Sequence, residues 1–368
     1  MKQIFISAGD PSGDLHASRL MKEIKRLLPE VRFIGFGGRA MIQEGLDSII
    51  GMEQISVVGF WEVAKRYFFF RKFLKKCTEI INSGDIDLFL PVDFPGFNLR
   101  LAKSAKANNV PVLYYIAPQL WAWGKNRAKG LKEKVDLLLT VFPFESDFFD
   151  RYDIETYFVG HPLLDDSDIP DKIPENDDRE DIIALLPGSR KQEILTILPV
   201  MIDTISLIEL DYPNYKFGIA KSSNIDEELY HSIIGSNNKC DLWENSRELM
   251  KTARAGIVKT GTSNLEAALC GMPFVMVYLT SFASYYLAKN LINLDRLSLV
   301  NILARKEVVK ELIQNDADKR LIAKQLDSIL SNQMKYEYMQ SQFLGIRNLL
   351  GEKGAARNAA KKIVEYLK

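Results

Sequence analysis

The chain has 368 residues, more than one typical hydrophobic core supports and enough for two domains. Its 48 Lys and Arg residues balance 48 Asp and Glu residues, so no net field recruits nucleic acid, and we expect no nucleic-acid partner. The 3 cysteines lie far apart, which argues against a disulfide framework or a cysteine zinc site and fits a reducing cytoplasm. The first residues enter an apolar strand without a signal-peptide pattern, and no apolar run is long enough to span a bilayer.

Short apolar strands alternate with amphipathic helices along the chain. Strands are predicted, in chain order, at residues 3–8, 32–36, 87–92, 110–116, 137–141, 157–159, 182–186, 216–220, 256–259 and 274–278. Their apolar runs are continuous rather than alternating, which indicates parallel strands covered on both faces. The predicted fold class is therefore α/β, with two Rossmann-like, doubly wound domains facing each other across a cleft.

An acidic, proline-containing segment at residues 165–181 has the composition of a linker, and a new series of strand-helix units begins after it. We therefore predict an N-terminal domain at residues 1–168 and a C-terminal domain at residues 169–345. Residues 346–368 end in a helix that we expect to cross back to the first domain or to reach a partner subunit.

The first predicted strand runs into a glycine-containing loop, SAGDPSGDLH, at residues 7–16. Asp10, Ser12 and Asp14 place polar side chains at the mouth of the sheet, where open α/β folds bind ligands. The alternative is a plain turn in which Ser12 or Asp14 caps the following helix. The glycine spacing is not that of a dinucleotide fingerprint, so we expect no nicotinamide cofactor.

Asp93 ends the apolar strand predicted at residues 87–92. In a cleft, partial desolvation would raise the pKa of this carboxyl and make it a candidate general base. The alternative is a turn-forming Asp ahead of a proline.

Asp85 and Asp87 match the D-x-D pattern of metal-dependent sugar transferases. They precede their strand, however, and therefore lie at the sheet edge away from the expected site. No cluster of His, Cys and carboxylate side chains offers a better metal site, so we expect no metal.

Two further strands run into turns rich in Gly, Ser and Thr, each followed by a predicted helix. The first turn carries Gly188, Ser189 and Arg190, and the second carries Gly261 and Thr262. Such turns present backbone N–H groups to an anion at a helix start, and a guanidinium adds a planar fork suited to phosphate. Glu266 follows one helical turn later, within reach of a sugar hydroxyl, so the pair of turns suggests a nucleotide-diphosphate site. The alternative is two ordinary strand-to-helix turns.

Further along the chain, Asn301 precedes a predicted helix rich in Lys, Arg and Glu. It can cap that helix or reach into the cleft.

The segment APQLWAWGKNR at residues 117–127 follows another predicted strand and combines two tryptophans with two cations. Trp121 and Trp123 can line an apolar or sugar-binding surface beside Lys125 and Arg127. The alternative is packing of both tryptophans in the domain core.

Residues 57–76 combine dense aromatic side chains with many cations. The expected membrane-contact residues are Phe60, Trp61, Tyr67, Phe68, Phe69, Phe70, Arg71 and Lys72. A helix of this composition suits a membrane interface, with aromatics buried and cations on anionic headgroups. Packing within an oligomer is the alternative, and nucleic acid is a weaker one because no single-strand-binding motif accompanies these residues.

Seven motifs stand in an order that resembles the lipid A disaccharide synthase family of GT-B glycosyltransferases. They lie at residues 8–14, 92–98, 118–123, 159–162, 185–190, 261–266 and 298–301. The resemblance implies transfer of a sugar from UDP-2,3-diacylglucosamine to 2,3-diacylglucosamine 1-phosphate. The implied products are a β-1,6-linked disaccharide 1-phosphate and UDP, with inversion and without a metal or cofactor.

The resemblance also assigns residues. It implies that Asp93 is the catalytic base, Arg190 binds the diphosphate and Glu266 contacts the nucleotide. It also implies that Asn301 is the essential asparagine, which we place with the residues that bind the UDP donor. It implies a peripheral position on the cytoplasmic face of the inner membrane and allows a homodimer. The chain departs from the family pattern at Asp10, where glutamate is usual, and at Pro91, where glycine is common. Rival interpretations are a nucleotide-sugar epimerase, a related transferase with another acceptor, and a two-lobed binding protein without catalysis.

Overall fold

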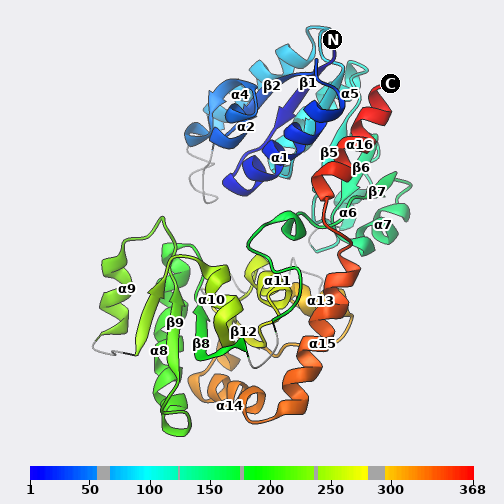
Figure 1. Cartoon of the computed structure of the whole chain (residues 1–368). Coiled ribbons are helices and arrows are strands. Elements are labelled where there is room, and N and C mark those ends of the chain that lie inside the picture. Colours follow the sequence, from blue (N-terminus) through cyan, green and yellow to red (C-terminus); the bar gives the residue numbers. More distant parts are fainter. Residues whose placement is uncertain (56–66, 123–124, 175–177, 236–238, 281–294) are drawn as a thin grey trace. The chain divides into compact units, whose positions relative to one another are not determined.

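The computed structural model describes residues 1–55, 67–122, 125–174, 178–235, 239–280 and 295–368 (Figure 1). The chain divides into two compact units. The first comprises Met1–Asp165 together with Leu350–Lys368, and the second comprises Asp166–Leu349. The change of unit after Asp165 falls at the start of the acidic segment, and the C-terminal residues belong with the first unit.

Parallel strands form the sheet of the first unit. Four pair in the order β3-β2-β1-β4 and three in the order β5-β6-β7, and isolated parallel bridges from Phe89 to Val112 and from Val92 to Tyr115 join β4 to β5. The strands are β1 (Gln3–Ser7), β2 (Arg32–Gly37), β3 (Leu46–Gly51), β4 (Leu88–Pro91), β5 (Leu113–Tyr115), β6 (Leu137–Thr140) and β7 (Thr156–Phe158). The carboxyl ends of these strands therefore share one edge, where the loops predicted to carry chemistry emerge.

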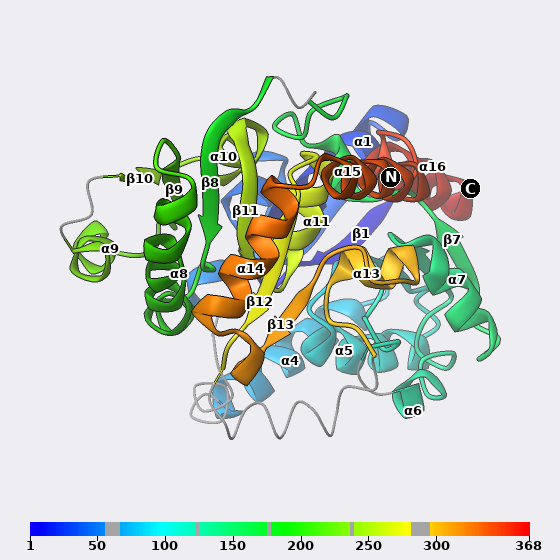
Figure 2. The same ribbon diagram turned by 90° about the horizontal axis from the view of Figure 1, so that it is seen from below.

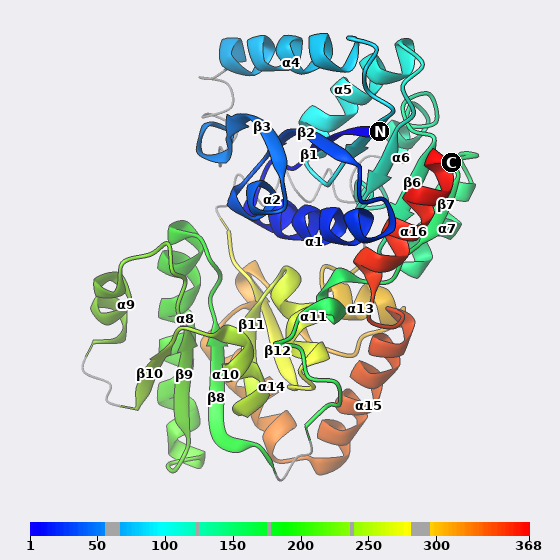
Figure 3. The same cartoon turned by 45° about the horizontal axis from the view of Figure 1, so that its top comes forward.

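Helices cover both faces of this sheet. They are α1 (Pro11–Leu27), α2 (Arg39–Gln43), α4 (Tyr67–Ile81), α5 (Pro95–Ala107), α6 (Lys125–Ala128), α7 (Pro143–Asp150) and α16 (Ala355–Leu367), with short 3-10 turns η1 (Met52–Gln54) and η2 (Pro162–Asp165). Figure 3 shows α4 and α5 on one side of β1–β3, and α1 and α2 on the other.

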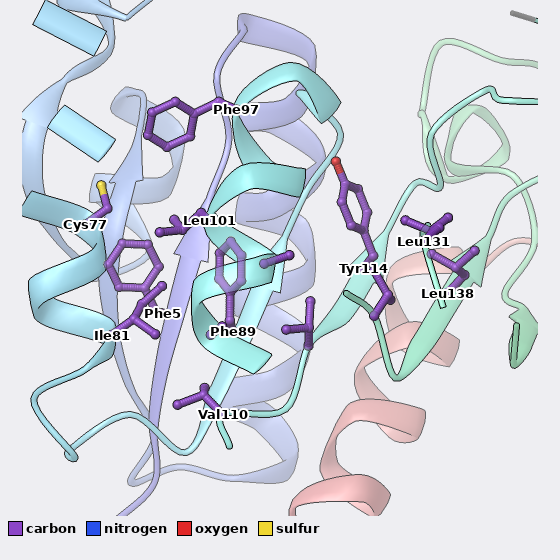
Figure 4. Packing of buried hydrophobic residues seen from close by; sticks show 14 of the residues in the cluster. Phe5, Cys77, Ile81, Phe89, Phe97, Leu101, Val110, Tyr114, Leu131 and Leu138 are labelled. Carbon is purple, nitrogen blue, oxygen red and sulfur yellow. The ribbon is translucent and has the colours of Figure 1, made fainter. Parts of the chain in front are cut away.

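One hydrophobic cluster lies between the sheet and the helices α4 and α5 (Figure 4). Phe73, Cys77 and Ile81 recur every fourth residue of α4 and are buried there, as expected for the inner stripe of an amphipathic helix. From the sheet, Phe5 and Phe89 meet with ring centroids 5.7 Å apart, edge to face. The cluster fixes α4 to the unit along one stripe and leaves its other side outward.

The C-terminal helix α16 packs on α1 (Figure 1). Its buried face combines the small side chains of Ala355, Ala359 and Ala360 with the larger Ile363 and Leu367. The Asp165 carboxylate accepts hydrogen bonds from the N–H groups of Gly354, Ala355 and Ala356 and so caps the helix. The end of the chain is thus tied to the first unit by apolar packing and by a cap.

The second unit has a single parallel sheet in the order β10-β9-β8-β11-β12-β13 (Figure 2). Its strands are β8 (Glu180–Leu186), β9 (Lys216–Ala220), β10 (Cys240–Trp243), β11 (Ala253–Lys259), β12 (Phe274–Tyr278) and β13 (Glu311–Ile313). Its helices are α8 (Lys191–Asp211), α9 (Glu227–Ile234), α10 (Ser246–Thr252), α11 (Thr262–Leu269), α13 (Leu299–Ala304), α14 (Lys319–Leu330) and α15 (Gln333–Leu349), with the 3-10 turn η4 (Gln314–Asp316). The strand order reverses between β8 and β11, which is the switch point where doubly wound sheets bind ligands.

The predicted α/β class with Rossmann-like units is confirmed. The sequence missed three strands, β3, β10 and β13, all of which lie at sheet edges. Edge strands are covered less completely, so their residues do not form the continuous apolar runs on which the prediction relied. In the described part of the chain, no helix is long and apolar enough to cross a membrane.

Candidate functional site

The two predicted anion-binding turns lie side by side in the second unit. β8 and β11 pair in register, with Leu186 opposite Val258, so the turns that follow them emerge together. A cavity of about 540 Å³ opens there. Its lining comes from the ends of four strands and includes Gly188, Ser189, Arg190, Glu193, Lys221, Ser222, Ser223, Glu244, Ser246, Lys259, Gly261 and Thr262.

Both turns use glycine where a side chain would be strained. Gly188 has φ 117° and Gly261 has φ 134°, values that favour glycine. Arg190 and Gly261 are the N-cap residues of α8 and α11, and no side chain of either residue accepts a first-turn N–H of its helix. First-turn N–H groups at two helix starts therefore border one cavity, the arrangement that binds phosphate oxygens.

Cations and carboxylates alternate around the cavity. The Arg190 side chain is 68% exposed, and its guanidinium lies 3.5 Å from the Glu193 carboxylate. Lys259 Nζ lies 2.9 Å from the same carboxylate. Lys221 pairs with Glu227 and Glu244, whose hydrogen bonds and charges hold the pKa of its ammonium well above the usual range. Three cations thus line the cavity, and each is paired with a carboxylate of the chain.

Glu266, one turn into α11, is oriented by a second arginine. Its Oε1 accepts hydrogen bonds from Arg247 Nε at 3.1 Å and Nη2 at 2.8 Å, and Arg247 Nη1 also lies 2.7 Å from Asp166. All three side chains are largely buried. The sequence predicted Glu266 but missed the Arg247 that fixes it.

The side-chain amide of Asn301 uses all of its hydrogen-bonding positions within its own unit. Its Oδ1 accepts from the N–H groups of Val308 and Val309, and its Nδ2 donates to Val309 O and to Glu311 Oε1, at 2.7–3.0 Å. An asparagine amide has two donors and a two-lone-pair acceptor, so no position is left for a ligand. The side chain is 1% exposed and holds the start of α13 to the segment before β13.

Asp93 follows β4 in a strained but well-held backbone. Asp93 and Phe94 both have positive φ, 46° and 52°, in the left-handed region that non-glycine residues rarely adopt. The Asp93 carbonyl accepts hydrogen bonds from Asn98 Nδ2 at 2.7 Å and Tyr114 Oη at 2.5 Å. Asn98 Oδ1 is in turn held by Ser7 Oγ at 2.9 Å. The buried network fixes the backbone of Asp93, from which the carboxylate extends.

The carboxyl of Asp93 has a perturbed acidity. Burial, reinforced by the charge of Asp10 and opposed by the Phe94 N–H, raises its pKa to about 6. That value suits a base which must be ionised, yet still able to take a proton, near neutral pH.

The 7–16 loop beside Asp93 is arranged differently from the capping alternative. Asp10, rather than Ser12 or Asp14, caps α1, accepting from the Gly13 N–H at 2.7 Å. Ser12 is exposed. Asp14 is buried, and its carboxylate accepts from the N–H groups of Gly38, Ala40 and Met41, which fixes the loop before α2. The alternative in which Ser12 or Asp14 caps the helix is therefore wrong, because sequence spacing alone did not separate three neighbouring polar residues.

A close approach couples this loop to the Asp93 turn. A Cβ on Gly9 would lie 2.3 Å from the Phe94 ring, so only glycine admits the ring at this point. The loop that carries Asp10 and the turn that carries Asp93 are therefore packed as one surface.

Trp121 takes the core-packing alternative. It is buried, its Nε1 donates to Glu145 Oε1 at 3.1 Å, and its ring meets Phe144 edge to face at 4.9 Å. Burial raises the pKa of Glu145 to about 7, against the Phe142 N–H, the Trp121 Nε1 and the Val141 N–H that hydrogen-bond to it. Trp123 lies outside the described residues, as does the side chain of Lys125, and Arg127 is exposed.

The aromatic-basic segment is described from Tyr67 onward, so Phe60 and Trp61 lie outside the described residues, as does the Tyr67 side chain. Phe68 is 79% exposed at the start of α4, and Arg71 and Lys72 are exposed beside it. Phe69 and Phe70 are half-buried and pack on Phe73 and Phe97. A cavity of about 500 Å³ lined by Phe69, Phe73 and three lysines (Lys72, Lys75 and Lys76) opens on the same side.

Asp87 of the D-x-D pattern accepts from Lys2 Nζ and the Gln3 N–H at the start of β1. It thus ties two strands together at the edge away from Asp93. Among the described residues, no group of three His, Cys, Asp or Glu side chains is placed to hold a metal ion.

The chain matches known proteins over its full length. The family model described as Lipid-A-disaccharide synthetase matches residues 4–365. The chain is 36% identical to the lipid-A-disaccharide synthase of Persephonella marina, covering 99% of each chain, and 33% identical to that of Geobacter metallireducens, covering 100% of this chain and 97% of the relative.

Solved structures of low identity share the fold. The UDP-GlcNAc 2-epimerase from Neisseria meningitidis bound to UDP-GlcNAc matches with a TM-score of 0.61 at 13% identity, over 100% of this chain and 99% of the other. The calicheamicin glycosyltransferase CalG4 matches with a TM-score of 0.61 at 15% identity, over 100% and 98%. These matches show the two-unit GT-B fold, and the relatives show an enzyme that transfers a glycosyl group: the chain belongs to the lipid-A-disaccharide synthase family.

Proposed function

We propose that this protein transfers the diacylglucosamine unit of UDP-2,3-diacylglucosamine to 2,3-diacylglucosamine 1-phosphate, forming the β-1,6 disaccharide 1-phosphate of lipid A and UDP. The observation that carries the proposal is Asp93. Its backbone carbonyl is held by a buried network at the strand-end edge of the first unit, and the pKa of its carboxyl is raised to about 6.

In the proposed step, the Asp93 carboxylate takes the proton from the acceptor 6-hydroxyl. The hydroxyl oxygen attacks the anomeric carbon of the donor, the bond from that carbon to the diphosphate oxygen breaks, and UDP leaves with the electron pair. A single displacement of this kind inverts the anomeric configuration. Because pH 7 lies just above the pKa of the Asp93 carboxyl, the carboxyl is mostly ionised at that pH. After the transfer it returns to the ionised state by releasing the proton to solvent.

The donor diphosphate would lie in the cavity of the second unit. Its negative charge would meet Arg190, Lys259 and the N–H groups at the starts of α8 and α11. These fixed donors stabilise the charge that grows on UDP as the bond breaks, which is the role a metal plays in other transferases. We therefore expect no requirement for a metal or another cofactor.

Glu266 and Asn301 take different roles in this proposal. Arg247 engages one oxygen of Glu266, and the other oxygen suits a ribose hydroxyl of the nucleotide. The saturated Asn301 instead acts as a positioning residue for the 298–311 region. Its replacement would disturb the unit locally rather than remove a ligand contact.

Both substrates carry acyl chains, and α4 supplies a surface for the membrane that holds them. The exposed side of α4 combines Phe68 with Arg71 and Lys72 and continues into the lysine-lined cavity. We propose that this side docks peripherally on the cytoplasmic leaflet of the inner membrane. Replacing Phe68, Phe69 and Phe70 with serine should abolish flotation with anionic vesicles, and retained flotation would contradict the docking role. A homodimer remains a prediction that sedimentation of the purified protein would check.

The deciding experiment is the reaction itself. Purified protein is mixed with both lipid substrates in detergent and EDTA, and the products are followed by mass spectrometry. Disaccharide 1-phosphate and UDP are expected, whereas a changed UDP-sugar without a disaccharide would favour the epimerase alternative that the solved structures share by fold. Asp93→Asn should lower turnover by roughly a hundredfold or more.

Asp85→Asn is the matched control, because Asp85 is exposed and lies at the other end of the same strand. It should leave turnover unchanged. Equal losses in both variants, or near-normal turnover in a folded Asp93→Asn protein, would contradict the assignment of the base.

A further inference from the structure

The Glu193 carboxylate lies among the groups that would bind the donor diphosphate. Its Oε2 accepts from the Ser189 N–H at 3.2 Å, and its Oε1 lies 2.9 Å from Lys259 Nζ and 3.5 Å from Arg190 Nη1. A turn N–H, an ammonium and a guanidinium are the donors that proteins use for phosphate. In this unit, the Glu193 carboxylate of the chain itself contacts all three donors.

The carboxylate is inside the turn rather than on the surface. Glu193 is 17% exposed at its side chain and lines the cavity. A Cβ on Gly188 would lie 2.3 Å from Glu193 Oε2, so the glycine at φ 117° leaves the space that the carboxylate fills. Glycine here thus serves the carboxylate as well as the turn.

Helix capping alone does not explain this placement. Glu193 is the third residue of α8, where a capping-box glutamate would accept the N–H of the N-cap residue, Arg190. It accepts instead from Ser189, one residue earlier, and also engages Lys259 at the end of β11. The carboxylate therefore bridges the two turns that the proposed diphosphate would bridge.

We infer that Glu193 is an internal counter-anion of the donor site, which the diphosphate displaces on binding and which returns when UDP leaves. The inference rests on the proposed donor site and adds the residue that sets its affinity. Binding of the UDP-sugar then replaces one anion by another on Lys259 and the Ser189 N–H. The net binding free energy therefore contains only the difference between the two interactions. The same competition favours release of UDP after transfer.

Calorimetry with the wild type, Glu193→Gln and Glu209→Gln tests this role, with UDP and uridine as the two ligands. Removing the charge in Glu193→Gln should tighten UDP binding about tenfold, the change that one competing charged hydrogen bond gives. Uridine, which has no phosphate, should bind all forms equally. Glu209→Gln is the matched control: it makes the same substitution in the same helix, about 24 Å away at 1.5 Å per residue, and should change neither affinity.

Product inhibition gives an independent readout. UDP should inhibit the forward reaction of Glu193→Gln more strongly than that of the wild type, whereas a purely structural loss would weaken binding and activity together. Unchanged or weaker UDP binding by a folded Glu193→Gln protein, or an equal shift for uridine, would overturn the inference while leaving the donor site in place. Failure of the wild type to bind UDP would overturn the donor site itself.

Discussion

Asp93→Asn should stabilise the protein while it removes the proposed base. The pKa of Asp93 rises from 3.8 to about 6 on folding, because burial and then the Asp10 charge disfavour the ionised carboxylate. A raised carboxyl pKa costs nothing below the unfolded value and its full amount above the folded value, so stability falls as the pH rises from about 4 to about 6. At about 1.4 kcal/mol per pKa unit, the charge costs about 3 kcal/mol at pH 8 and roughly half of that at pH 5.

Chemical denaturation at the two pH values measures this cost. Asn keeps the shape of Asp and an oxygen that can accept the Phe94 N–H, so the variant should unfold at higher denaturant concentration at pH 8 than the wild type. The advantage should shrink at pH 5 by about 1.4 kcal/mol. Asp203→Asn, at an exposed carboxylate paired with Lys319, is the control and should show no such pH dependence. An equal effect of Asp93→Asn at both pH values, or a loss of stability at pH 8, would refute the reasoning.

Three further predictions follow from single contacts. Trp121→Phe removes the indole donor to the buried Glu145 and should cost about 1–3 kcal/mol in denaturant unfolding; an unchanged midpoint would show that the bond contributes nothing. Arg190→Lys loses the planar fork and should weaken UDP binding in calorimetry by about tenfold, with retained affinity counting against a bidentate contact. Gly188→Ala should lower the melting temperature, since its added Cβ would meet Glu193 at 2.3 Å, more than Gly235→Ala does at a positive-φ glycine with open space around it; equal shifts would assign the loss to backbone strain alone.

The sequence predicted the inner strands of both sheets, because helices on both faces bury them and force continuous apolar runs. Lys216–Ala220 and Phe274–Tyr278 match their predicted bounds. The missed strand Leu46–Gly51 carries Asp47 and Ser48 in its first half and pairs on one side only. Its polar residues are tolerated because one edge of the strand is open. The segment forms a strand because it pairs with β2, and its own sequence does not encode that neighbour.

The residues of the candidate site also fall into those that the sequence could predict and those that it could not. Motifs that are contiguous in sequence, such as Gly188 to Arg190, could be found because the turn and the helix start are local. The partners that set their chemistry come from distant segments: Glu193 meets Lys259, and Glu266 meets Arg247. No pattern within either segment encodes these pairs. A partial signal existed for Glu193, since an acidic third helix residue is typical of a cap, but its ion pair needed the register of β8 on β11.

The network around Asp93 indicates why the strain at this residue persists. Two consecutive residues in the left-handed region are unfavourable by themselves, and such strain survives only where surrounding contacts impose it. Here the Asp93 carbonyl is held by Asn98 from α5 and Tyr114 from β5, and Asn98 is anchored by Ser7 from β1. Because all three side chains are fully buried in the first unit, the folded core fixes the backbone from which the carboxylate extends. A base on a backbone held in this way needs little rearrangement to meet a hydroxyl, so the strain and the charge burial at Asp93 both serve preorganisation.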